Sequence, residues 1–222
     1  MKQLLSILTA FLLFSATANA SNHKLSCTEA DQSKSIELRL LKQAPYYAAR
    51  ISSHVLKIKF TTGDKIFTDK PPYEELNGVR WTYCGYDKAS KIHLIGKSVD
   101  DIFTGIILFD RSGKMLNAGH TVIISPNKYK YLAIEQRNGR DGEDWTVMNF
   151  DGKKLWSGYA GIIKNNAKNN YESVVATFEN PNWNNDSNLT AQANCIGSTN
   201  KKAVSLINIG DLWEWAPIPK CE

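Results

Sequence analysis

The stretch GKMLNAGHTVIISPNKYKYLAI, residues 113–134, decides which fold this chain is expected to adopt. Two apolar runs within it, Val122–Ile124 and Tyr131–Ile134, stand on either side of the turn residues Ser125–Asn127. Short apolar runs separated by proline and asparagine are typical of antiparallel strands joined by a turn. The stretch therefore predicts a β-hairpin near the middle of the chain.

Part of this stretch recurs at an offset of 39 residues, in GKKLWSGYAGIIKNN at 152–166. The shared form is a turn carrying Gly-Lys, then Leu-x-x-Gly, then an apolar strand and a second turn. The matching pairs are Gly113 with Gly152, Lys114 with Lys153, Leu116 with Leu155, Gly119 with Gly158, Ile124 with Ile163 and Asn127 with Asn166. A period near 40 residues in a strand-rich chain is the blade period of β-propellers.

The strand entry formed by Ile124–Asn127 and Tyr131–Ile134 resembles the S-P-[DN]-G-K-x-L-A entry of TolB-like and WD-type propeller repeats. In this chain Lys128-Tyr129-Lys130 stands where those repeats carry Gly-Lys, so the turn is one residue longer. The resemblance covers residues 108–178. It implies a propeller-like array of β-hairpin repeats, and it implies nothing about function.

The same strand signals recur outside the repeat. Leu56, Ile58 and Phe60 alternate with lysines, which is the period of a half-buried strand. The run FTGIILF at 103–109 predicts a buried strand, and Asp151-Gly152 predicts a hairpin turn. Further strands are expected at 92–94, 145–150, 174–178 and 204–209.

Two segments carry weaker signals. Residues 35–41 fit either a strand or a short helix, and the Asn-rich segment 180–194 has the composition of a long exposed loop. The predicted fold class is therefore all-β, in one domain over residues 21–222. The favoured form is the propeller-like array of hairpin repeats, and the alternative is a compact β-sandwich or barrel.

The first twenty residues carry the pattern of a secretory signal peptide. Lys2 gives a positive start, Leu4–Ala16 is almost wholly apolar, and Ala18-Asn19-Ala20 forms an A-x-A cleavage site. The mature protein is expected to begin at Ser21, and its Asn- and Lys-rich composition favours the bacterial periplasm. No second apolar run of membrane-spanning length follows, so no membrane span is expected.

Four cysteines follow the cleavage site: Cys27, Cys84, Cys195 and Cys221. An even number in an oxidising compartment predicts two disulfides, for which three pairings exist. The local pattern, Cys27 with Cys84 and Cys195 with Cys221, is favoured because its loops are shorter. Bonds that tie the termini together, Cys27 with Cys221 and Cys84 with Cys195, are the main alternative.

The charge distribution and the absence of known motifs exclude several classes of partner and of chemistry. The formal net charge of +5 is spread along the chain, so no nucleic-acid-binding arm is expected, and an acidic protein or the anionic cell envelope fits this charge better. No G-x-S-x-G elbow, P-loop or dinucleotide fingerprint occurs, and the four histidines lack metal-ligand spacing. No catalytic residue, metal or cofactor is therefore expected.

Two segments are the candidates for a binding surface. The acidic tip Asp141, Glu143 and Asp144 lies on a glycine-rich loop, where a solvated hairpin end is the simplest interpretation. Trp183 lies in the polar run Asn-Pro-Asn-Trp-Asn-Asn-Asp, where no apolar pattern explains burial. An aromatic ring in a polar loop fits a contact surface, and packing back on the sheet is the other interpretation.

Together these features predict an exported, non-catalytic protein-binding protein of the periplasm. The clearest instance is an inhibitor or immunity protein against an envelope-targeting effector enzyme. Two alternatives stay open. An envelope hydrolase needs paired carboxylates or a nucleophile and base in a pocket, and a carbohydrate-binding protein needs a row of exposed Trp and Tyr rings.

Overall fold

The computed structural model describes residues 23–27, 30–73, 77–99, 102–136, 142–166, 171–184, 188–210 and 212–221. Across these segments the chain is mostly strand, so the all-β fold class is confirmed. The expected signal peptide, residues 1–20, and Asp141 lie outside the described residues.

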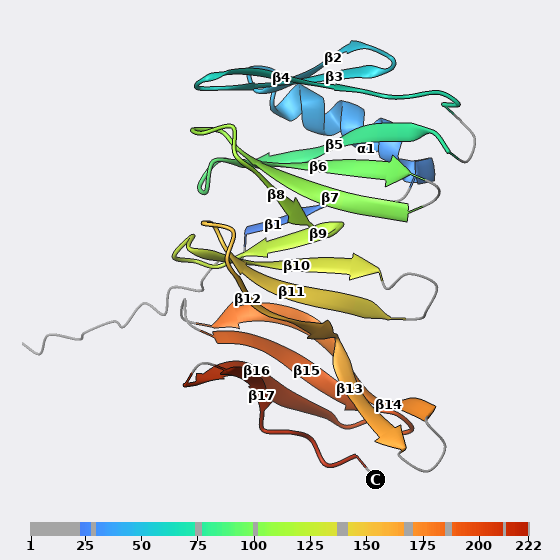
Figure 1. The fold of residues 1–222 in the computed structure, drawn as a ribbon, viewed down its shortest axis with the longest axis vertical. Coiled ribbons are helices and arrows are strands. Elements are labelled where there is room, and N and C mark those ends of the chain that lie inside the picture. The colour runs from blue at the N-terminus through green and yellow to red at the C-terminus, as the bar shows by residue number, and fades with distance from the viewer. Residues whose placement is uncertain are drawn as a thin grey trace, which may run out of the picture.

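Four antiparallel sheets are stacked along the long axis of the molecule, and we number them as layers from the N-terminal end (Figure 1). The first layer holds β2 (Ala48–Ser52), β3 (Val55–Phe60) and β4 (Gly63–Thr68), with α1 (Ala30–Gln43) between it and the second layer. The second holds β5 (Val79–Asp87), β6 (Ile92–Val99), β7 (Ile102–Phe109) and β8 (Met115–Ala118). The third, in spatial order, holds β1 (His23–Ser26), β9 (Thr121–Ile124), β10 (Lys130–Gln136), β11 (Glu143–Asn149) and β12 (Lys154–Tyr159). The fourth holds β13 (Gly161–Asn166), β14 (Tyr171–Asn184), β15 (Asn188–Cys195), β16 (Lys201–Ile209) and β17 (Leu212–Ala216).

Hydrophobic cores fill the spaces between successive layers. Ile123 and Leu132 of the third layer belong to the core that faces the fourth layer, whereas their neighbours Val122 and Tyr131 belong to the core that faces the second. Successive side chains of a strand point to opposite faces, so both faces of this sheet are buried. This explains why the strand segments at its centre are apolar throughout rather than alternating.

The 39-residue repeat marks equivalent places in successive layers. In the alignment of its two halves, β8 corresponds to β12 and β9 corresponds to β13. β8 and β12 are each the last strand of an antiparallel meander. Gly113 and Gly152, in the turns before β8 and β12, have φ angles of 64° and 96°, in the left-handed region that favours glycine. After these strands the chain crosses to the next layer through only Gly119–His120 in one case and Ala160 in the other.

The stack is open in Figure 1, because the first and fourth layers lie at opposite ends of the long axis. A closed propeller would bring its first and last sheets side by side around a central channel. The described strands therefore form several stacked sheets rather than a closed ring.

Helix α1 resolves the segment that the sequence left open between strand and helix. Glu37, Leu41 and Ala44 are buried on one side of the chain here, at the spacing of three to four residues that a helix face requires. The apolar period is interrupted by the buried carboxylate of Glu37, which is why the pattern was weak.

The exposed loop predicted at 180–194 is wrong, because β14 continues to Asn184 and β15 begins at Asn188. Leu189, Ala191 and Ala193 are buried at alternate positions, and their side chains belong to the core between the third and fourth layers. This period of two was present in the sequence, but the surrounding asparagines obscured it.

Two disulfides join distant parts of the chain. Cys27 pairs with Cys84 and Cys195 pairs with Cys221, so the local pairing is confirmed. The first bond ties the end of β1, in the third layer, to β5, in the second. Disulfides are typical of exported proteins. In the described part of the chain no helix is long and apolar enough to cross a membrane.

Candidate functional site

A cleft with a volume of about 830 Å³ opens between the third and fourth layers, on the side where β1 lies. Ligand pockets commonly measure about 300–1,000 Å³. The cleft lies where the third sheet, widened by β1, extends past the strands of the fourth sheet that pack on it.

The floor of the cleft is one face of the third sheet. Ser26, Thr121, Ile134 and Trp145 are directly opposite one another on four adjacent strands, so their side chains form a row across the sheet. The hydroxyls of Ser26 and Thr121 are 2.8 Å apart and hydrogen bonded. The floor is therefore polar at the β1 end and apolar toward β11.

The wall of the cleft is the second half of β14. β13 pairs with β14 only as far as Thr177, and Phe178 then donates its backbone N–H to the carbonyl of Ala160 at 2.8 Å. Between Glu179 and Asn182 the pairing of β14 with β15 skips a position, and Asn180 has a φ of 51°. This β-bulge lies on the rim of the cleft, a placement common beside functional sites.

Two carboxylates line the cleft, and both are held by neighbours. Glu143 accepts a hydrogen bond from Nε1 of Trp145 at 2.8 Å. Glu179 accepts one from Nζ of Lys201 at 2.6 Å, and this contact lowers the pKa of Glu179 below its usual value. Lys24 and His120 are the basic residues of the lining.

The cleft brings together both segments that the sequence singled out for binding. Gly142 and Glu143 belong to the acidic tip, and Asn180–Asn182 belong to the polar run that contains Trp183. These two segments are far apart in the sequence, and only the packing of the third and fourth layers places them side by side.

Trp183 itself is not exposed, so the prediction that its ring forms a contact surface is wrong. Its side chain is 3 % exposed, and Nε1 donates to the carbonyl oxygen of Ile123 at 2.9 Å. The ammonium of Lys130 lies 5.8 Å from the ring centroid. The indole thus packs back on the third sheet, which is the other interpretation of the sequence.

Asp144 lies away from the cleft, because neighbouring residues of a strand point to opposite faces and Glu143 and Trp145 face the cleft. Asp144 is directly opposite Glu135 in the register. Burial, and then the charge of Asp144, raise the pKa of Glu135. The carboxyl group with a raised pKa is therefore on the face turned away from the cleft.

The sequence missed the contributions of β1 and of the layer crossings. Lys24 and Ser26 come from a strand of four residues, His120 lies in one crossing between layers, and Tyr159 precedes the other. The strand that pairs with β1 is β9, which lies about a hundred residues later in the sequence. No local pattern identifies such residues.

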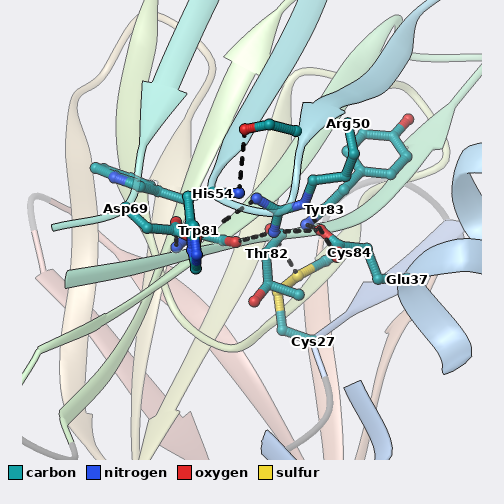
Figure 2. A network of polar contacts seen from close by, with 10 residues as sticks. Cys27, Glu37, Arg50, His54, Asp69, Trp81, Thr82, Tyr83 and Cys84 are labelled. Atoms are coloured by element: carbon teal, nitrogen blue, oxygen red, sulfur yellow. Dashed lines mark hydrogen bonds and ion pairs between the residues drawn. A yellow bond between two sulfur atoms is a disulfide. The ribbon is translucent and has the colours of Figure 1, made fainter. Parts of the chain in front are cut away.

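The densest charged cluster of the described chain lies elsewhere, between the first and second layers (Figure 2). Arg50 of β2 donates to both carboxylate oxygens of Glu37, at 2.9 and 3.3 Å, and to the carbonyl of Trp81. Glu37 also accepts the backbone N–H of Tyr83 at 2.7 Å. Asp69 accepts the backbone N–H of Trp81 at 2.8 Å. Since Glu37 and Asp69 are buried and pair within the protein, this cluster joins α1 and β2 to β5.

His93 is a second buried titratable group away from the cleft. It is fully buried in β6, its Nδ1 lies 3.3 Å from the hydroxyl of Tyr83, and the ring of Tyr86 stacks on it at 4.4 Å. Burial lowers the pKa of His93 to about 4, against a smaller opposite effect of Asp110. The imidazole is therefore neutral in the folded protein across the physiological range.

Acidification from pH 7 to pH 4 is expected to remove roughly 3 kcal/mol of stability through His93 alone. An unfolded histidine takes up a proton near pH 6.5, whereas folded His93 resists it until about pH 4, so the unfolded state binds more protons in this window. Urea unfolding at several pH values measures the slope. His93→Gln should flatten the slope between pH 6.5 and 4. Equal slopes for wild type and His93→Gln would contradict this assignment.

Among the described residues, no group of three histidine, cysteine or acidic side chains is placed to hold a metal ion. Comparison of the chain with protein-family models, with curated proteins and with solved structures gives no match.

Proposed function

We propose that this protein is an exported, non-catalytic binding protein of the bacterial periplasm, and that a partner protein inserts a segment into the cleft between the third and fourth layers. The observation that carries the proposal is the convergence of the acidic tip and the polar end of β14 on this one cleft. An inhibitor or immunity protein that blocks an envelope-targeting effector enzyme is the role that fits best.

The construction of the cleft supports a binding role. Its floor and wall are strands packed on buried cores, and the Cys27–Cys84 bond holds the end of β1, which supplies one edge of the floor. A rigid site loses little conformational entropy when a ligand binds. This is the property that a tight inhibitor requires.

The carboxylates favour binding over acid–base hydrolysis. A general acid needs a raised pKa, but the pKa of Glu179 is lowered by Lys201. Glu143 is already hydrogen bonded to Trp145, and Glu135, whose pKa is raised, is on the opposite face. An envelope hydrolase remains the alternative, with the same cleft as its site.

The tryptophans favour a protein partner over a glycan. All six lie in described segments, and none is exposed: Trp145 and Trp183 are buried and the other four are half-buried. The feature expected of a carbohydrate-binding protein was a coplanar row of exposed Trp and Tyr rings. Tyr46, Tyr73 and Tyr129 are exposed, but no tryptophan is exposed beside them.

We also infer that the fold is a propeller-like array in open form. The support is the equivalence of β8 with β12 and of β9 with β13 in the 39-residue repeat, together with the one- or two-residue crossings between layers. In this interpretation each layer from the second to the fourth corresponds to one blade.

Affinity capture with a cleft-blocking variant tests the proposed function. Tagged protein from Ser21 to Glu222 is exposed to envelope extracts and to the products of adjacent genes, and retained proteins are identified by mass spectrometry. Lys24→Trp fills the exposed rim of the cleft, and Lys59→Trp, on exposed β3 of the first layer, is its matched control. We expect one stoichiometric partner on wild type and Lys59→Trp, and at least about tenfold less of it on Lys24→Trp.

An activity assay on the retained partner then separates an inhibitor from a scaffold. Retention of the same proteins by all three forms would contradict the assignment of the cleft. If no form retains a protein, the weight moves to hydrolysis or glycan binding.

A further inference from the structure

One strand of the fourth layer exchanges one neighbour for the other along its length. β14 pairs with β13 over Tyr171–Thr177 and with β15 from Ala176 to Asn184, so only Ala176 and Thr177 have a paired strand on both sides. From Phe178 onward the described strands pair with β14 only through β15. Pairing on the β13 side of β14 thus ends where Ala160 accepts the N–H of Phe178. The cleft lies beyond this point, beside the rest of β14.

We infer, on the basis of the proposed function, that the partner segment that enters the cleft is an extended strand of about five residues that adds to this edge of β14. A strand in that position prolongs the line of β13 and becomes an additional strand of the fourth sheet. It lies over the floor that the third sheet forms.

The volume of the cleft agrees with this occupant. Its volume of about 830 Å³ lies in the upper part of the range of ordinary ligand pockets, about 300–1,000 Å³, and is large enough for a short peptide segment. Because the third and fourth layers already pack on each other, a strand added beside β14 rests on the floor at the ordinary stacking distance.

The length of the edge also fits a short segment. The backbone N–H of Phe178 is already donated to Ala160, so the edge that no described strand pairs begins after Phe178 and runs to Trp183, whose indole bonds to Ile123 of the third sheet. These five residues include the bulge at Asn180–Pro181, so the edge accommodates a segment of no more than about five residues.

Pro181 explains how such an edge avoids indiscriminate pairing. Proline lacks the N–H that a ladder needs, and proline or a bulge at an edge is a common protection against strand addition. Main-chain pairing is therefore interrupted, and side-chain contacts with the floor must contribute. Alternate side chains of the segment point to the floor, so apolar residues are expected over Ile134 and Trp145.

Charge at the ends of the floor favours one direction for the segment. Glu143 lies at the β11 side of the lining and Lys24 at the β1 side. A segment with a basic residue toward Glu143 and an acidic residue toward Lys24 is complementary to both. The recognised sequence is thus an extended run with apolar residues at alternate positions and opposite charges at its two ends.

A library of acetylated, amidated pentapeptides of this pattern, titrated into ¹⁵N-labelled protein from Ser21 to Glu222, tests the inference. We expect amide shifts confined to β14 from Phe178 onward and to the floor strands. N-methylation of the peptide amides that face β14 should weaken the best binder by about tenfold or more. N-methylation of the amides on its other edge is the matched control and should leave the affinity unchanged.

A protein variant adds a readout in the opposite direction. Pro181→Ala supplies a backbone N–H at the edge and should strengthen peptide binding, whereas Lys59→Trp should not change it. A library without a binder, or a binder that tolerates N-methylation on both edges, would overturn strand addition. If strand addition fails in this way but Lys24→Trp still reduces partner capture, the proposed function stands. If Lys24→Trp does not reduce partner capture but the peptides bind as expected, strand addition stands.

Discussion

Replacement of Cys27 and Cys84 by serine together is expected to lower the free energy of unfolding by about 4 kcal/mol. The bond closes a loop of 57 residues, and in the chain-entropy model a loop of this length restricts the unfolded chain by about that amount. Urea unfolding of the oxidised wild type and of the double variant measures the difference. The variant should also show faster amide exchange in β1, which the bond ties to β5.

The second disulfide is the natural comparison for this prediction. Cys195 and Cys221 are separated by 26 residues, so their removal should cost about 3.5 kcal/mol, somewhat less than removal of the longer loop. Removal of Cys27–Cys84 should abolish peptide binding in the cleft more readily, because β1 supplies Lys24 and Ser26. An unfolding free energy that does not change on removal of Cys27–Cys84 would contradict the predicted contribution of this bond to stability.

Replacement of Glu37 by alanine is expected to destabilise the protein by about 3–5 kcal/mol. The change removes the carboxylate to which the guanidinium of Arg50 donates twice, and it removes the acceptor of the Tyr83 N–H. Arg50 then keeps only the carboxylate of Asp69, whose Oδ2 lies 3.7 Å from Nη1, so its buried charge is poorly compensated, and this accounts for the large effect. Equilibrium unfolding in urea gives the measurement.

Two further variants make the Glu37 prediction specific. Glu37→Gln keeps an acceptor for Tyr83 and removes the charge, so its destabilisation should be intermediate, and it serves as the test if Glu37→Ala does not fold. Glu214→Ala, at an exposed residue of β17, should change stability by no more than about 0.5 kcal/mol. If Glu37→Ala is as stable as Glu214→Ala, the buried network does not hold the first and second layers together.

The central strands were predictable because both of their faces are buried. Residues 103–109, 122–124 and 131–134 are continuous apolar runs between turns, and β7, β9 and β10 include them. α1 was weakly signalled because Glu37, in the middle of its buried side, is made tolerable only by Arg50 from another strand. An ion pair of that kind has no trace in the local pattern of apolar residues.

Part of the candidate site could be predicted from the sequence. The acidic tip that contains Glu143 and the polar run around Trp183 have an unusual local composition, and this composition identified them as candidates. The proximity of these two segments and the burial of Trp183 depend on tertiary packing, in which the indole donates to the carbonyl oxygen of Ile123. The edge of β14 is equally invisible in the sequence, because it arises where β13 ends and not from any residue of β14.

The pairing of β1 with β9 has a consequence for the order in which the molecule folds as it enters an oxidising compartment. The N-terminal part enters first, so β1 is present almost one hundred residues before Thr121–Ile124 arrive to pair with it. Cys84 arrives before β9, so the bond to Cys27 can hold β1 beside β5 until β9 is present. The cleft is enclosed only when β14 has followed, so the proposed binding site is completed late in folding.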